Sequence, residues 1–142
     1  MTVQQDIEIL LGVDEKPHQL QEGVVPIYLE QRYDRLGAVE NIRDSGGLDP
    51  NALAALIRVL VVDDEEEVRE AALSALCEMC DDDTLKRTAL VLASVDQNER
   101  VLTTVLEQAN DLDLTFAKSI ASRLVNFPDP VVSDYAEGIL KK

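Results

Sequence analysis

The chain has 142 residues, of which 28 are acidic and 13 basic, so its formal net charge at pH 7 is −15. A field of this sign repels nucleic-acid phosphates and anionic membrane surfaces, so we expect neither as a ligand and expect a partner with a basic surface. The length fits a single domain over residues 1–142. Aromatic residues make up only 4% of the chain, and the apolar content is mainly Leu, Val, Ile and Ala. This composition favours an all-α fold of packed helices.

The N-terminal sequence and the cysteine count bear on location. The chain opens without a basic segment followed by an apolar run, so we expect no secretory signal. No apolar run approaches the roughly 20 residues of a membrane-spanning helix. Two cysteines are too few for a disulfide framework. Together these features predict a cytoplasmic protein.

Residues 1–47 have the least regular pattern and predict an atypical N-terminal cap. A short first helix is indicated by Ile7, Leu10 and Leu11, and residues 12–23, which contain Pro17, predict a loop. Two short helices should follow. The first opens at Pro26 and carries Leu29 and Tyr33; the second carries Leu36, Val39 and Ile42 and stops at Ser45-Gly46-Gly47.

Residues 48–81 contain the clearest pattern, an antiparallel helix pair. Asp49 is a good N-cap, and Pro50 suits the first helical position because its missing N–H needs no partner there. The acidic turn at Asp63-Asp64 separates the two helices. The first helix face is formed by Leu53, Leu56, Ile57, Leu60 and Val61, and the second by Val68, Ala71, Ala72, Ala75, Leu76 and Met79.

The same two-part pattern recurs in residues 82–111 and 112–142. Asp96-Gln97-Asn98 predicts a turn, and Asp129-Pro130 predicts another helix start. The expected apolar faces are Leu85, Ala89, Leu92 and Ala93; Leu102, Val105, Leu106 and Ala109; Phe116, Ala117, Ile120, Ala121, Leu124 and Val125; and Val132, Tyr135, Ala136, Ile139 and Leu140. Helix pairs that repeat at intervals of about 30 residues are typical of an α-solenoid.

The segment from Asp63 to Leu76, DDEEEVREAALSAL, resembles the second half of a HEAT repeat. It has the turn Asp, the Val-Arg pair, and small residues and a Leu at helical spacing. The resemblance implies a short right-handed superhelical stack of antiparallel helix pairs, with about four HEAT-like repeats and roughly 7–8 helices. It also implies a structural role for Asp63 and Arg69, which in that family bridge neighbouring repeats.

The other repeats depart from the family pattern. Ser133 and Thr103 stand where the family has Arg, and only fragments of the pattern surround Arg35. The repeats in residues 82–111 and 112–142 are therefore degenerate copies. We expect their stacking to depend mainly on apolar burial.

No catalytic, cofactor-binding or metal-binding set emerges, so we predict a protein that is not an enzyme and carries no cofactor. Cys77 and Cys80 have the spacing of half a zinc site, but the chain has only one His and no further Cys. His18 lies in the predicted Pro17 loop without a partner that would fix it. The acidic runs 63–67 and 81–83 do not fit a calcium loop, and they suit helix ends and caps better.

These features predict a protein–protein interaction scaffold with an acidic binding surface. The candidate contact residues lie on second helices of the pairs: Glu66, Glu70, Glu78 and Asp134. Uncovered end helices are also compatible with a homodimer. Two alternatives remain open. One is a protein that handles a tetrapyrrole or another cofactor, since bilin lyases carry similar repeats; the other is an acidic mimic of nucleic acid.

Overall fold

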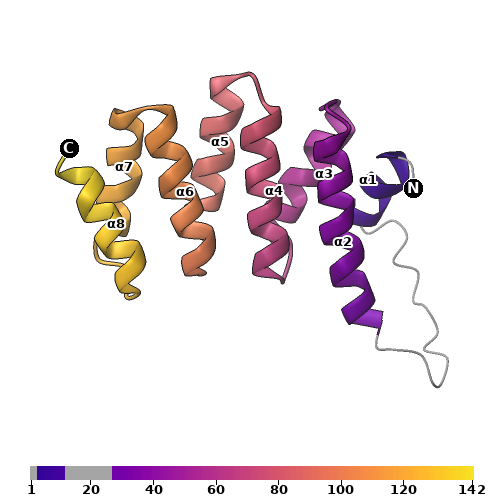
Figure 1. Ribbon diagram of the computed structural model, residues 1–142, viewed down its shortest axis with the longest axis horizontal. Helices are drawn as coiled ribbons and strands as arrows, with labels where there is room; N and C mark the ends of the chain where they lie inside the picture. Colours follow the sequence, from indigo (N-terminus) through magenta and orange to yellow (C-terminus); the bar gives the residue numbers. More distant parts are fainter. Residues whose placement is uncertain (1–2, 12–26) are drawn as a thin grey trace. The chain divides into compact units, whose positions relative to one another are not determined.

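The computed structural model describes residues 3–11 and 27–142, and these form eight α-helices and no strand (Figure 1). The prediction of an all-α fold is confirmed for this part of the chain. The helices are α1 (Val3–Leu11), α2 (Ile27–Asp44), α3 (Pro50–Val62), α4 (Glu66–Met79), α5 (Asp83–Ala93), α6 (Glu99–Leu112), α7 (Leu114–Leu124) and α8 (Pro130–Leu140). None of them has both the length and the apolar character needed to cross a membrane. The expected Pro17 loop and His18 lie outside the described residues.

The chain divides into two compact units, which we describe separately: unit 1, Met1–Cys80, and unit 2, Asp81–Lys142. In unit 1, α1 packs on α2 and α3, and α4 packs on α2 and α3. In unit 2, α6 packs on α5, α7 and α8, and α7 packs on α8. The single domain over residues 1–142 stays a prediction. The limit between the units falls within one residue of the limit predicted between the second and third repeats.

The α3–α4 pair begins as its sequence predicts. Asp49 caps α3, where its Oδ1 accepts from the Ala52 N–H at 2.8 Å, and Pro50 opens the helix. The helix ends at the Asp63-Asp64 turn, and Glu66 and Glu67 lie in the first turn of α4. Carboxylates are favoured there by the positive end of the helix dipole.

The buried face of α3 differs from the predicted one. Its buried residues are Ala52, Ala55, Leu56, Val59 and Leu60. Val61, which was expected in the core, is 53% exposed, and Leu53 and Ile57 are only half-buried. The predicted and the observed sets of buried positions both have helical spacing, so periodicity does not distinguish them. The prediction followed the set with more large apolar residues. The folded unit instead buries the alanines, which allow neighbouring helices to approach closely.

Residues 27–44 form one helix, so the prediction of two short helices there is wrong. The apolar positions at 29, 33, 36, 39 and 42 are three or four residues apart and therefore lie along one continuous helical face. Gly37 is the only weak helix former in that stretch, and a single Gly does not end a helix. The predicted stop is confirmed, because Gly46 adopts a positive φ of 72° and its N–H donates to Arg43 O at 3.2 Å.

Every helix of unit 2 begins at an N-cap whose side chain is bonded to the backbone, and the caps of α5, α6 and α8 fall at the predicted turns. Asp82, Asn98, Asp113 and Asp129 each accept from the backbone N–H two residues ahead, at 2.7–2.9 Å. The 81–83 acidic run therefore contains a cap, as predicted. Burial differs in α5, where Leu90 is buried while Leu85 and Leu92 are exposed, and Leu140 of α8 is also exposed. These residues were expected in the core on spacing alone.

The N-terminal helix buries a carboxylate without compensation. Asp6 of α1 is fully buried, beside the core residues Ile7 and Leu10, and neither of its oxygens has a hydrogen-bond partner. Its position in the first turn of α1 offers a helix-dipole contribution of about 0.3–1 kcal/mol. Burying a polar group without a hydrogen bond costs about 1–3 kcal/mol in mutational data. Asp6 therefore weakens the docking of α1 on α2 and α3.

We expect Asp6→Leu to stabilise unit 1 by about 1–3 kcal/mol, because the unsatisfied carboxylate is replaced by an apolar group. Asp6→Asn should give a smaller gain, since the amide remains unpaired. Thermal melts measure the gain, and hydrogen exchange should show stronger protection in α1. A loss of stability in Asp6→Leu would show that the carboxylate is satisfied in solution.

Candidate partner-binding surface

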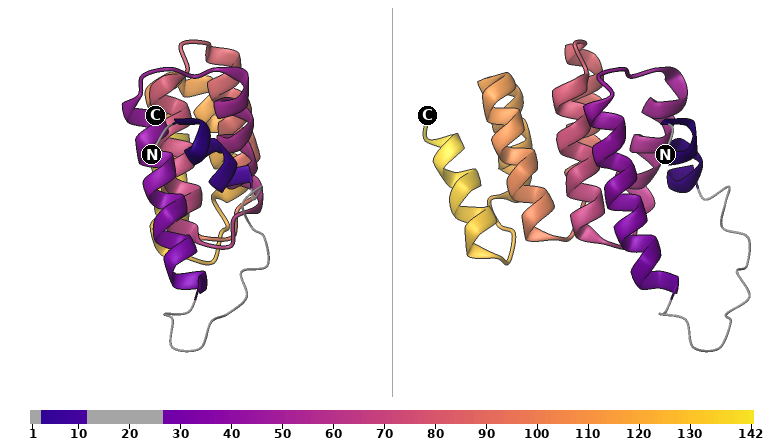
Figure 2. Two further views of the ribbon diagram at one scale, coloured as in Figure 1. Left: turned by 90° about the vertical axis from the view of Figure 1, so that its right-hand side faces the viewer. Right: turned by 45° about the vertical axis from the view of Figure 1, so that its right-hand side comes forward.

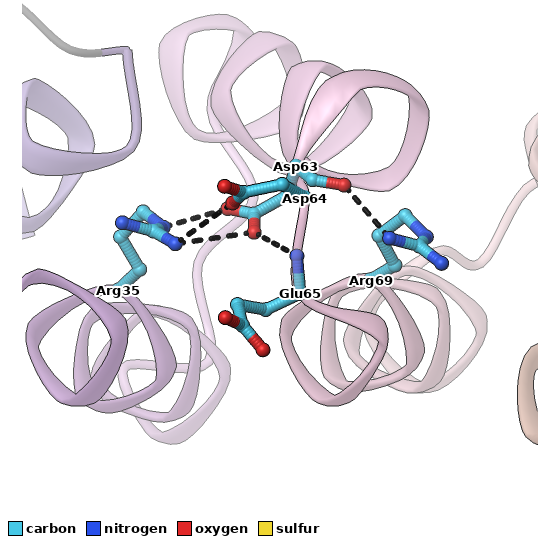
Figure 3. A network of polar contacts seen from close by, with 5 residues as sticks. All are labelled: Arg35, Asp63, Asp64, Glu65 and Arg69. Carbon is cyan, nitrogen blue, oxygen red and sulfur yellow. Dashed lines mark hydrogen bonds and ion pairs between the residues drawn. The ribbon is translucent and has the colours of Figure 1, made fainter. Parts of the chain in front are cut away.

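Asp63 lies at the centre of a polar network that joins three helices of unit 1 (Figure 3). Arg35 of α2 donates from Nε to Asp63 Oδ2 at 2.7 Å and from Nη2 to Asp63 Oδ1 at 3.3 Å. The same Nη2 lies 3.3 Å from Asp64 Oδ1. Asp63 Oδ1 also accepts from the Glu65 N–H at 2.9 Å, and Arg69 donates to the Asp63 carbonyl oxygen at 2.8 Å. The network thus fixes the α3–α4 turn against α2.

The resemblance to a HEAT repeat implied that Asp63 and Arg69 have a structural role and bridge neighbouring repeats. Both take part in structural contacts, and the side chain that binds the Asp63 carboxylate is Arg35, 28 residues earlier. The Arg35 and Asp63 side chains are 14% and 5% exposed. A pair so well shielded from solvent is a structural element, and it offers little to a partner.

A second ion pair, in unit 2, joins α5 to the α6–α7 turn. Arg87 Nη2 lies 2.8 Å from Asp113 Oδ2, and the Arg87 guanidinium lies 5.0 Å from the centre of the Phe116 ring. Asp113 ends α6 and caps α7 through the Thr115 N–H. The hydrogen bond from Arg87, followed by that from the Thr115 N–H, lowers the pKa of the Asp113 carboxyl. Sequence reasoning missed this pair, because Arg87 and Asp113 lie 26 residues apart.

The four predicted contact residues fall in different units. Glu66, Glu70 and Glu78 lie on α4 of unit 1, and Asp134 lies on α8 of unit 2. Glu66 and Glu70 are half-buried, whereas Glu78 and Asp134 are exposed. Glu78 Oε2 lies 3.9 Å from Arg43 Nε. Only Glu78 and Asp134 are thus well placed to meet a partner, and a contact made by all four stays a prediction.

A shallow open cavity of about 220 Å³ lies on α8 of unit 2, on a surface that sequence reasoning did not single out. We call it the Gly138 notch; it is lined by Tyr135, Gly138, Ile139 and Lys142. Within unit 2, α8 (yellow in Figure 2) packs against α6 (orange). The sequence signal that could have revealed the notch is a glycine in the last turn of a helix, three residues after a tyrosine and four before a lysine.

The surroundings of the notch are acidic. Burial raises the pKa of the Tyr135 phenol, and the negative charges of Glu107 and Asp111 on α6 raise it further. Both carboxylates are exposed. Lys142 contributes one positive charge, and its Nζ donates to Asn110 Oδ1 at 3.1 Å. The site therefore combines an aromatic ring with nearby carboxylates, a combination that suits a cationic group.

The cysteines lie at the C-terminal end of α4, where Cys77 is half-buried and Cys80 is buried. Cys80 is the C-cap residue, and its N–H donates to Leu76 O at 3.0 Å. The described residues contain no cluster of three or more His, Cys, Asp or Glu side chains that could hold a metal ion. The positions of both cysteines are those of packing residues at a helix end.

We expect Arg35→Met to destabilise unit 1 by about 3 kcal/mol, since it leaves the shielded Asp63 carboxylate without its main partner. Arg43→Met is the matched control, because Arg43 lies on the same helix and its contact to Glu78 is long and exposed. The control should cost less than about 1 kcal/mol. Urea unfolding of the full chain measures both. Equal effects would contradict the assigned role of the Arg35–Asp63 pair.

The Arg87–Asp113 pair should make the stability of unit 2 depend on pH. Because the folded state lowers the pKa of Asp113, its stabilising effect is present above the pKa of the unfolded chain and is lost as the pH falls through the folded value. We therefore expect Arg87→Met to lower the melting temperature at about pH 6, and the difference from the wild type should shrink towards about pH 2. Lys86→Met, one residue away on α5, should show a difference independent of pH. A constant difference for Arg87→Met would refute this assignment.

Comparison with known proteins does not assign this surface. No protein-family model, curated protein or solved structure matches the chain. The resemblance to HEAT-like repeats therefore rests on the residues that carry it.

Proposed function

We propose that the chain is a non-enzymatic protein-interaction module of the HEAT-like type that binds a partner with a basic surface. The helix pairs support this architecture within each unit, where the second helices also pack side by side: α2 with α4, and α6 with α8. Stacked helix pairs present an extended face of second helices, which repeat proteins use for binding. The repeat assignment and the partner are both parts of the proposal.

The observation that carries the proposal is that most described basic side chains are bonded within the chain, whereas many described carboxylates are not. Most described basic side chains are engaged within the chain: Arg35 and Arg87 bind turn carboxylates, Lys141 pairs with Glu137 at 3.0 Å, and Arg123 donates to Ser94 Oγ at 3.3 Å. Basic groups held in this way leave many carboxylates uncompensated.

Among the described residues, unit 2 exposes carboxylates without an ion pair on its second helices, α6 and α8, as well as at the start of α5. Glu107, Asp111 and Asp134 are exposed, and within the described part of the chain none of them forms an ion pair. Uncompensated surface charge speeds the encounter with an oppositely charged partner and selects against like-charged ones. The α6–α8 face is therefore the surface that we propose for binding.

The test compares two variants that each remove two exposed carboxylates. Glu107→Gln combined with Asp111→Asn alters the α6–α8 face, whereas Glu40→Gln combined with Asp81→Asn changes the same amount of charge elsewhere. Binding of a short peptide of mixed Lys and Arg residues is measured by calorimetry at low salt. We expect about fivefold to tenfold weaker binding for the first variant, as two exposed ion pairs are lost, and a much smaller effect for the control.

Two outcomes would overturn the proposal. If the wild-type chain binds the basic peptide no better than it binds oligoglutamate, a basic partner is wrong. If both variants weaken binding equally, the attraction comes from net charge alone and the α6–α8 face is not the site.

A further inference from the structure

Gly138 lies within α8, where a glycine has no evident structural purpose. A glycine inside a helix destabilises it relative to alanine, because its backbone loses more conformational freedom on folding. A Cβ built at Gly138 would meet no atom within 4 Å, and its φ is not in the left-handed region. Neither packing within the chain nor backbone geometry requires a glycine there. Its effect on the surface is to leave open the notch between Tyr135 and Lys142.

The walls of the notch have distinct chemistry. The Tyr135 ring is half-buried, so its orientation is restrained by packing, and its phenol lies close enough to Glu107 and Asp111 to be affected by their charge. Ile139 supplies an apolar, buried part of the lining. The ring and Ile139 suit a flat group with an apolar stem, and the carboxylates of α6, which lie outside the lining, favour a cationic one.

Three lysines and two further carboxylates also lie in this region. Lys142 lies at the notch and is held by Asn110, while Lys118 donates to the Lys142 carbonyl oxygen at 3.3 Å. Asp134 and Glu137 are exposed on α8, and Glu137 is paired with Lys141. Lys142 is thus the one cation in the lining, and it opposes the entry of another.

We propose that the Gly138 notch receives an arginine side chain of the basic partner, with its guanidinium over the Tyr135 ring and its charge facing Glu107 and Asp111. Arginine suits this place better than lysine, because its guanidinium is planar, stacks on aromatic faces and is more weakly hydrated. The absent Gly138 side chain gives the guanidinium room beside the helix backbone. This inference rests on the proposed function, since it names the group by which the partner is recognised.

Gly138→Ala gives a test in which stability and binding change in opposite directions. The added methyl group should raise the melting temperature, since it replaces a helical glycine without a clash, and it should weaken the binding of a short oligoarginine peptide about tenfold. Gly37→Ala is the matched control, because Gly37 also lies inside a helix and its added Cβ also meets nothing within 4 Å. The control should raise the melting temperature and leave binding unchanged.

Substitutions at Tyr135 and Lys142 separate stacking from general attraction. Tyr135→Phe should retain oligoarginine binding, while Tyr135→Leu should weaken it, because only an aromatic face attracts the guanidinium. Lys142→Gln should tighten binding, since it removes the opposing charge. An oligolysine peptide of the same length should bind more weakly than oligoarginine and should respond less to Tyr135→Leu.

The results distinguish this inference from the function on which it rests. If the wild type, Gly138→Ala and Gly37→Ala all bind oligoarginine equally well, the notch is not the binding site, while the proposal of a basic partner still stands. Equal loss in both variants also overturns the notch, because Gly37 lies outside it. Failure of the wild type to bind any basic peptide overturns both proposals.

Discussion

Carboxylates outnumber basic side chains by 28 to 13, and this imbalance limits how the chain can compensate its charges. One solution is visible at the helix N-termini, where Asp49, Asp82 and Asp129 accept from backbone N–H groups. Such caps satisfy groups that the helix itself leaves unpaired, and the helix dipole favours the negative charge. These three acidic residues thus find their partners in the backbone, without using any of the scarce basic side chains.

The basic side chains are used where helices have to be held together. Arg35 joins α2 to the α3–α4 turn in unit 1, and Arg87 joins α5 to the α6–α7 turn in unit 2. Each binds an Asp that also bonds a backbone N–H, so one guanidinium orders a turn and a helix contact at once. The two pairs differ in shielding: Asp63 is almost fully buried, while Asp113 keeps more than a third of its side chain exposed. Asp63 is therefore the more sensitive to loss of its arginine.

The carboxylates that remain define the character of the surface. Unit 2 leaves Glu107, Asp111 and Asp134 exposed, and the first two act electrostatically on the half-buried Tyr135. In the proposal of a basic partner, net charge supplies attraction and the Gly138 notch supplies selectivity for one side chain. Asp6, by contrast, is a buried carboxyl group of α1 whose two oxygens accept no hydrogen bond from the described residues.

The sequence by itself determined the helical class, the caps at Asp49 and Asp129, the turn at 96–98 and the buried face of α6, because these depend on neighbours within about two helical turns. It could not decide which of two equally periodic stripes of α3 is buried, since that depends on how closely the alanines let another helix approach. It missed the continuity of α2, where a pattern without a turn signal was divided in two. The arginines that bind the carboxylates of Asp63 and Asp113, and the electrostatic effect of the α6 carboxylates on Tyr135, were decided only by tertiary structure. These contacts join residues more than twenty positions apart, and no local pattern encodes such a distance.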